Sequence, residues 1–159
     1  MAKMNAALFD GAGTMRITEM EKPVAGPGDA IIRVRAAGIC GSDLLMNADK
    51  TEPDAVPAGH EVAGEIVEVG EGVGPSRIGE RVAVETIGHG LACTRCWYCR
   101  MGQFRQCLNK APSEGGGFAV FMKRRAMGCY PLPESLSWEE GALVEPLAVS
   151  VHALRRGGM

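Results

Sequence analysis

Residues 93–107 read CTRCWYCRMGQFRQC, a stretch in which four cysteines follow the spacing C-x2-C-x2-C-x7-C. Gaps of two residues allow a short chain to wrap one tetrahedral ion, and zinc in a structural role prefers four such thiolates. The stretch therefore predicts a closed structural zinc lobe over about residues 88–110, so any chemistry must lie elsewhere in the chain. Two disulfides are the alternative, but so dense a set of half-cystines is typical of small secreted scaffolds. The expected ligands are Cys93, Cys96, Cys99 and Cys107.

The composition is that of an ordinary globular chain. Its 159 residues are 46% hydrophobic and carry a formal net charge of -2. A chain of this size can bury one core, so one domain spanning residues 1–159 is expected. The slightly acidic balance gives no general attraction to nucleic acid or anionic membranes, and the apolar run in residues 1–10 is too short for a signal peptide or a membrane span. We expect a cytoplasmic protein with neither nucleic acid nor membrane as a partner.

Short segments with partial apolar alternation recur along the first 125 residues and are separated by many of the 22 glycines and nine prolines. This pattern predicts a mostly β fold, a barrel or sandwich with tight turns, in preference to a helical bundle. The expected strands cover residues 5–9, 15–20, 30–36, 61–69, 81–85 and 118–124.

The last thirty residues change to helical character. Ser137 and Glu140 have the spacing of a capping box, and Glu145-Pro146 is a second helix start. The sequence predicts a terminal helix over about residues 145–156 with a C-cap at Gly157 and Gly158. Because this helix has an apolar stripe, we expect it to lead into a further element or to dock on its own barrel.

A second group of metal-ligating residue types is scattered through the chain. Catalytic zinc needs three or four protein ligands of mixed type with room left for water or substrate. Each residue has an ordinary interpretation when taken alone: a buried thiol, a turn histidine or a solvated carboxylate. Together the candidates are Cys40, His60, Glu61 and Glu145.

Three ordered motifs resemble those of the zinc-dependent medium-chain alcohol dehydrogenases. Gly59-His60-Glu61-x2-Gly64-x5-Gly70-x2-Val73 is similar to the zinc signature of that family with every fixed position filled. Cys40-Gly41-Ser42-Asp43 resembles the segment with its first zinc ligand, and residues 93–107 resemble its structural zinc lobe. Glu145-Pro146 is similar to the branch that includes sorbitol and threonine dehydrogenases.

The resemblance implies a GroES-like, partly open β-barrel with short helices, followed by a Rossmann domain that binds NAD or NADP. It implies oxidation of an alcohol, polyol or amino alcohol by zinc-assisted hydride transfer. Ser42 would pass the substrate proton onward, and Asp43 would orient the ring of His60. A helix N-cap is the alternative role for Ser42 and Asp43. The implied zinc ligands are Cys40 and His60, with Glu61 and Glu145 binding the metal directly or through its water.

Two departures from the family pattern limit the implied activity. Leu45 stands where many relatives carry a histidine that ends the proton relay. No glycine-rich nucleotide fingerprint is present, because residues 11–13 and 115–117 lack the helix pattern that must follow and are interpreted as turns. We therefore expect a catalytic-domain fragment without the Rossmann domain, inactive alone, that self-associates through uncovered apolar surface.

Two other functions stay open. One is a folded, non-catalytic interaction fragment. The other is a zinc module that grips a nucleic-acid backbone, since basic and aromatic residues interleave with the cysteines of the lobe; the acidic balance and the Cys40–His60 constellation favour the enzyme.

Overall fold

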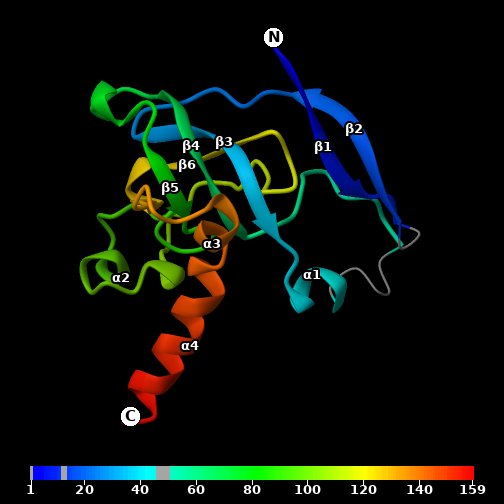
Figure 1. Ribbon diagram of the computed structural model, residues 1–159. Coiled ribbons are helices and arrows are strands. Elements are labelled where there is room, and N and C mark those ends of the chain that lie inside the picture. Colours follow the sequence, from blue (N-terminus) through cyan, green and yellow to red (C-terminus); the bar gives the residue numbers. More distant parts are fainter. Residues whose placement is uncertain (1, 12–13, 46–50) are drawn as a thin grey trace.

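The computed structural model describes residues 2–11, 14–45 and 51–159 and contains two antiparallel sheets (Figure 1). A hairpin forms the smaller sheet, and the larger has five strands in the order β6-β3-β4-β5-β7. An isolated bridge between Ala6 and Ala119 joins the hairpin to the chain that precedes β6. The strands are β1 (Lys3–Phe9), β2 (Met15–Glu21), β3 (Asp29–Gly38), β4 (Glu61–Val69), β5 (Arg81–Val84), β6 (Phe121–Arg125) and β7 (Cys129–Pro131).

The expectation of a mostly β fold is confirmed, and the six expected strands are all present. The last of these begins three residues later than expected, at Phe121. Phe118 and Val120 instead bond to other segments: the N–H of Phe118 donates to Ala58 O, and that of Val120 to Asn5 O. β7 has only three residues and was not predicted.

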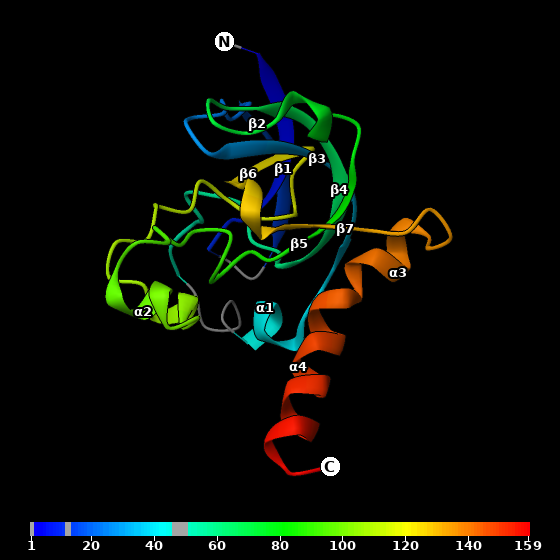
Figure 2. The same cartoon turned by 90° about the vertical axis from the view of Figure 1, so that its left-hand side faces the viewer.

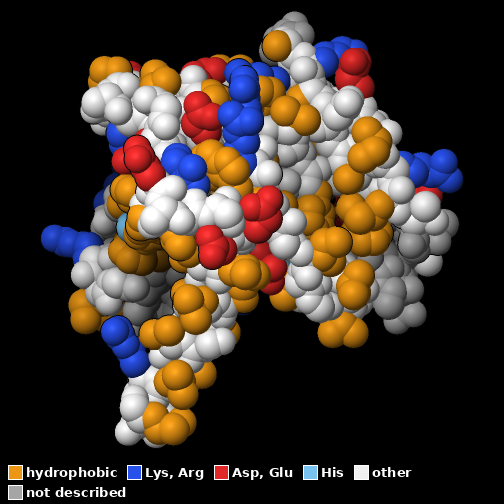
Figure 3. Space-filling view, viewed as in Figure 1, with side chains coloured by type: hydrophobic (Ala, Val, Ile, Leu, Met, Phe, Trp, Pro, Cys, Tyr) orange, Lys and Arg blue, Asp and Glu red, His pale blue; other side chains and the backbone are white. Residues whose placement is uncertain are grey.

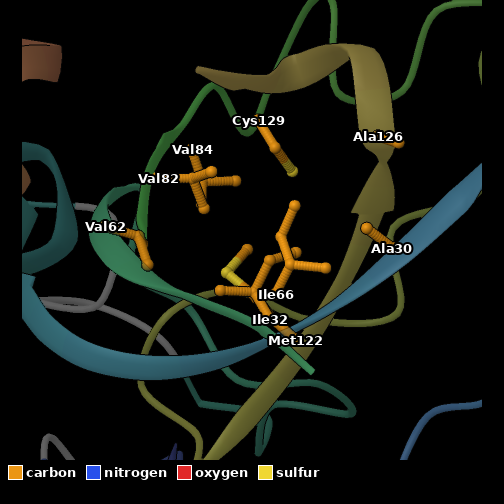
Figure 4. Packing of buried hydrophobic residues seen from close by; sticks show 9 residues of the cluster. All are labelled: Ala30, Ile32, Val62, Ile66, Val82, Val84, Met122, Ala126 and Cys129. Atoms are coloured by element: carbon orange, nitrogen blue, oxygen red, sulfur yellow. The ribbon is translucent and has the colours of Figure 1, made fainter. Parts of the chain in front are cut away.

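The core lies inside the curved larger sheet (Figure 4). Ile32 from β3, Ile66 from β4, Val82 from β5 and Met122 from β6 each have at most 2% of their surface exposed. Alternate side chains of a strand share a face, so the short apolar repeats of the sequence converge on this one cluster. The core thus fixes how the strands register, and that register places the candidate site.

Four α-helices complete the described structure: α1 (Gly41–Leu45), α2 (Trp97–Arg100), α3 (Trp138–Ala142) and α4 (Val144–Arg156). The predicted capping box is confirmed at α3, where Ser137 Oγ accepts from the Glu140 N–H at 3.1 Å and Glu140 Oε2 accepts from the Ser137 N–H at 2.8 Å. The terminal helix is also confirmed, one residue earlier than expected. Gly157 caps it and Gly158 has a φ of 77°.

Helix α4 projects away from the barrel (Figures 1 and 2). None of its residues is buried, and apolar side chains follow much of its visible length (Figure 3). Leu147 is 61% exposed and Val149 is 62% exposed. The sequence allowed two roles for this helix, leading into a further element or docking on its own barrel. The described structure does not show the helix docked on the barrel over its full length. No described helix is long and apolar enough to cross a membrane.

The glycines at 115–117 form no helix start, in agreement with their interpretation as a turn. The N–H of Gly116 donates to Pro57 O at 2.6 Å, and that of Gly117 donates to Gly59 O at 2.9 Å. A Cβ on Gly116 would collide with the carbonyl oxygen of Gly59, so only glycine allows this approach. This turn therefore supports the segment that leads to His60. In the other glycine turn, residues 12 and 13 lie outside the described residues.

Candidate metal centres

Cys40 lies at the junction between β3 and α1. Asp43, three residues on, accepts a hydrogen bond from the backbone N–H of Cys40 at 2.9 Å and donates its own N–H to Cys40 O at 3.0 Å. This is one half of a capping box in which Cys40 precedes the helix and Asp43 is its third residue, so Asp43 supports the start of α1 without being the N-cap itself. Ser42 makes no such contact in the described structure.

Asp43 also faces His60, as the orienting role requires. Its Oδ1 lies 3.6 Å from Nδ1 of His60, within ion-pair range but too far for a good hydrogen bond. Asp43 is buried, with 6% of its surface exposed. The same carboxylate therefore holds the backbone beside Cys40 and lies against the ring of His60.

Glu61 begins β4 directly after His60 and pairs with Gly38 at the end of β3. A Cβ at residue 38 would collide with Glu61 Oε2, which shows that the carboxylate lies over this glycine. Glu61 is buried, with 8% of its surface exposed. The missing side chain at Gly38 provides the space that this buried carboxylate occupies.

These contacts bring together three of the four predicted catalytic-zinc ligands. One ligand atom each from Cys40, His60 and Glu61 lies within 4.8 Å of the others. A sulfur, a nitrogen and an oxygen from three protein groups fit a zinc ion that keeps one position open. The chemistry and spacing of the donors therefore fit the predicted catalytic site.

Glu145 lies near this group but is not part of it. Partial burial raises the pKa of Glu145, while His60 lowers it and the nearby Glu61 and Glu85 raise it. Glu145 lines a cavity of about 490 Å³ between the start of β4, the end of β5 and helix α4, together with Tyr130 and His152. Its charge therefore interacts with His60 and Glu61, although Glu145 is not in the group whose ligand atoms lie within 4.8 Å of one another.

Ser42 lines a neighbouring cavity of about 360 Å³. Asp43, His60, Thr86 and Arg124 line the same cavity. The hydroxyl of Ser42 and the ring of His60 thus face one cavity, in which Ser42 could receive a proton. Leu45, the residue at the expected end of the proton relay, is 79% exposed, and its side chain has no group that accepts a proton.

The four cysteines of the predicted lobe also converge, and their ligand atoms lie within 4.8 Å of one another. The sulfurs of Cys96 and Cys99 are 3.5 Å apart, and those of Cys96 and Cys107 are 4.0 Å apart. Zinc–sulfur bonds of about 2.3 Å in a tetrahedron place the sulfurs about 3.8 Å apart. The lobe therefore has the dimensions of a four-thiolate zinc site.

The backbone of the lobe favours thiolates. The N–H groups of Cys93 and Asn109 donate to Cys107 Sγ at 3.3 and 3.4 Å. Hydrogen bonds from the backbone of Arg95 and Cys96 lower the pKa of Cys93 to about 6. Burial, together with hydrogen bonds to Cys96 and Cys107, raises the pKa of Cys99 to about 12. All six cysteines are free, so the disulfide alternative is not found.

The sequence motifs do not point to two structurally important residues, Glu85 and Arg124. Glu85 accepts three backbone N–H groups, from Ile87, Gly88 and Gly90, and so organises the turn before the lobe. Arg124 is 4% exposed and lies beside the cavity next to His60. Strand alternation could have indicated Arg124, because it shares a face with the core residue Met122.

Comparisons with known proteins find similar sequences among the dehydrogenases. The profile of the alcohol dehydrogenase GroES-like domain matches residues 26–134. Sorbitol dehydrogenase of Arabidopsis thaliana is 41% identical over 95% of this chain and 43% of its own length. L-idonate 5-dehydrogenase of Vitis vinifera is 37% identical over 97% of this chain and 44% of its own length.

Among solved structures, a short chain alcohol dehydrogenase (rspB) from E. coli CFT073, in complex with NADH, superimposes with a TM-score of 0.83. It is 30% identical, and the match covers 99% of this chain and 47% of that protein. The chain thus spans under half the length of each of these relatives.

Proposed function

This chain belongs to the alcohol dehydrogenase GroES-like domain family, and from that membership we propose that it carries the catalytic metal site of a zinc-dependent, NAD(P)-linked dehydrogenase. The substrate would be a small alcohol, polyol or amino alcohol. The single observation that carries the proposal is the convergence of Cys40, His60 and Glu61 around one point, with Asp43 against the histidine.

Each residue has a defined task in this proposal. Cys40 and His60 would hold the zinc, with Glu61 as a third ligand and Glu145 reaching the site through water. Bound zinc would supply Lewis-acid polarisation of the substrate oxygen. Asp43 would fix the ring of His60, and the Ser42 hydroxyl would receive the substrate proton and pass it to water in the adjoining cavity.

Nicotinamide nucleotide binding is proposed for a Rossmann domain outside these 159 residues. The described part of the chain has no glycine-rich strand–turn–helix to cradle a pyrophosphate. The matched relatives extend well beyond the region that this chain covers. We therefore expect this chain alone to bind two zinc ions and to oxidise no alcohol.

Zinc counting by elemental mass spectrometry tests the proposal. Chelator-washed wild-type protein should retain two zinc ions, and the His60→Ala and Cys96→Ser variants should each retain one. One zinc in the wild type, lost only in Cys96→Ser, would contradict the catalytic site and leave a folded, non-catalytic zinc-binding fragment.

A second experiment tests the activity. Adding a nucleotide-binding domain from a relative should restore alcohol-dependent nicotinamide reduction in wild type but not in His60→Ala.

We also propose that the isolated chain self-associates through the exposed apolar residues of α4, among them Leu147, Val149 and Leu154. Sedimentation of a monomer with a single sharp melting transition would contradict this. A cytoplasmic location is proposed because the two metal centres need reduced thiols.

A further inference from the structure

Arg124 is an unusual residue to find inside a small barrel. It lies in β6 with its side chain 4% exposed, on the face that also carries Met122. Burial lowers its pKa to about 10, so the guanidinium remains charged at neutral pH. A buried charge costs free energy unless its donors are satisfied, so its partners indicate its purpose.

Those partners come from several segments, and all are carbonyl or hydroxyl oxygens. Nε donates to Thr86 O at 3.2 Å, and Nη1 donates to Gly115 O and Lys123 O, both at 2.7 Å. Nη2 lies 3.5 Å from Ser113 Oγ, at the limit of a hydrogen bond. The planar guanidinium thus connects the chain after β5, the loop at 113–115 and β6.

Two of these segments lie directly against the segment that presents His60. Thr86, whose carbonyl oxygen accepts from Arg124, donates its own hydroxyl to His60 O at 3.4 Å. In the turn that follows Gly115, the N–H of Gly116 donates to Pro57 O and the N–H of Gly117 donates to Gly59 O. The side chains of Arg124 and His60 line the same cavity. The backbone on both sides of His60 is therefore bonded to elements that Arg124 holds.

We propose that Arg124 is a positioning residue that fixes the backbone of His60 for metal binding by cross-linking Thr86 and Gly115. The rigid fork of an arginine suits this role, because it offers donors in several directions at once. The metal-binding part of this inference rests on the proposed function; the cross-linking part does not.

The test compares Arg124→Met with wild type and with Arg125→Met. Arg125 is the next residue of the strand, but it pairs with Asp29 and Pro27 O, away from His60. Amide hydrogen exchange of Gly116 and Gly117 is measured in metal-free protein. Zinc affinity at each centre is then measured by chelator competition, with the four-cysteine lobe as an internal reference.

In Arg124→Met, we expect amide protection at Gly116 and Gly117 to fall at least about tenfold. We also expect zinc affinity at the Cys40–His60–Glu61 centre to fall about 10- to 100-fold, with the lobe unchanged. Arg125→Met should behave as wild type in both measurements.

Unchanged amide protection, or equal losses of affinity at both centres, would overturn the proposal. If wild-type protein binds no zinc at the Cys40 centre, the proposed function fails while hydrogen exchange still decides the role of Arg124. If Arg124→Met does not fold, Arg124→Lys decides, because one ammonium cannot span the same acceptors. Wild-type protection in that variant would show that charge alone suffices and would overturn the cross-linking role.

Discussion

Nδ1 of His60 lies 3.6 Å from Oδ1 of Asp43, while Oδ2 of the same aspartate accepts the backbone N–H of Cys40. The two carboxylate oxygens thus contact the two residues that offer nitrogen and sulfur to one metal centre. A carboxylate beside a metal-binding imidazole sets its tautomer and orientation. Asp43 therefore couples the local cap of α1 to a residue 17 positions later in the sequence.

Asp43→Asn should weaken zinc binding at the Cys40–His60–Glu61 centre by about 10- to 100-fold, because the neutral amide orients the imidazole less strongly. Zinc affinity of the four-cysteine lobe should not change. Chelator competition on the same sample measures both. Equal affinity in variant and wild type would show that Asp43 acts only as a helix cap.

Gly38→Ala should expel the carboxylate of Glu61 from its position, because the new Cβ would occupy the place of Oε2. We expect zinc content to fall from two ions to one per chain. The matched control is Gly41→Ala, where a Cβ meets nothing within 4 Å. Loss of zinc in the control as well would contradict a specific steric cause.

Cys96→Ser should remove the lobe zinc and loosen residues 93–107 while the sheet stays folded. Cys96 is within 4.0 Å of two other sulfurs, so its loss opens the tetrahedron. Elemental analysis should show one fewer zinc, and hydrogen exchange should rise in the lobe but not in β3 or β4. Global unfolding of the variant would contradict an independent lobe.

Ile66→Ala should lower the free energy of unfolding by about 2–5 kcal/mol, because Ile66 is fully buried in the cluster of Figure 4. Ile17→Ala, at a position 72% exposed, should change it by no more than about 0.5 kcal/mol. Urea denaturation of zinc-saturated protein measures both. A similar loss at both positions would be incompatible with this core.

Cys129→Ala should change how stability depends on alkaline pH. Burial raises the pKa of the Cys129 thiol from 9.0 to about 12, so the folded state keeps a proton that the unfolded state loses. That contribution is complete below pH 9 and is lost as the pH rises toward 12. The stability of wild type relative to the variant should fall by about 1.4 kcal/mol between pH 8 and 10. Denaturant titrations at each pH measure this difference, and a constant difference would place Cys129 in contact with solvent.

Much of the fold followed from local sequence signals. The alternating segments predicted six strands, and the Ser137–Glu140 spacing predicted a capping box that the structure contains. The start of β6 differs from the expectation because the N–H groups of Phe118 and Val120 donate to Ala58 and Asn5, which lie outside the larger sheet. Three-residue β7 carries too few positions for an alternation to be recognised.

The sequence by itself determined which residues are suited to bind metal, since thiols, imidazole and carboxylates are recognised by type and the four lobe cysteines lie within fifteen consecutive residues. Only the tertiary structure decided that Cys40 meets His60 and Glu61 while Glu145 stays outside the group. It also decided that Gly38 leaves space for Glu61 and that Arg124 is buried beside His60. The physical reason is distance along the chain: neighbouring ligands need only local turns, whereas distant ones are brought together by the pairing of β3 with β4 and by the core that fixes its register.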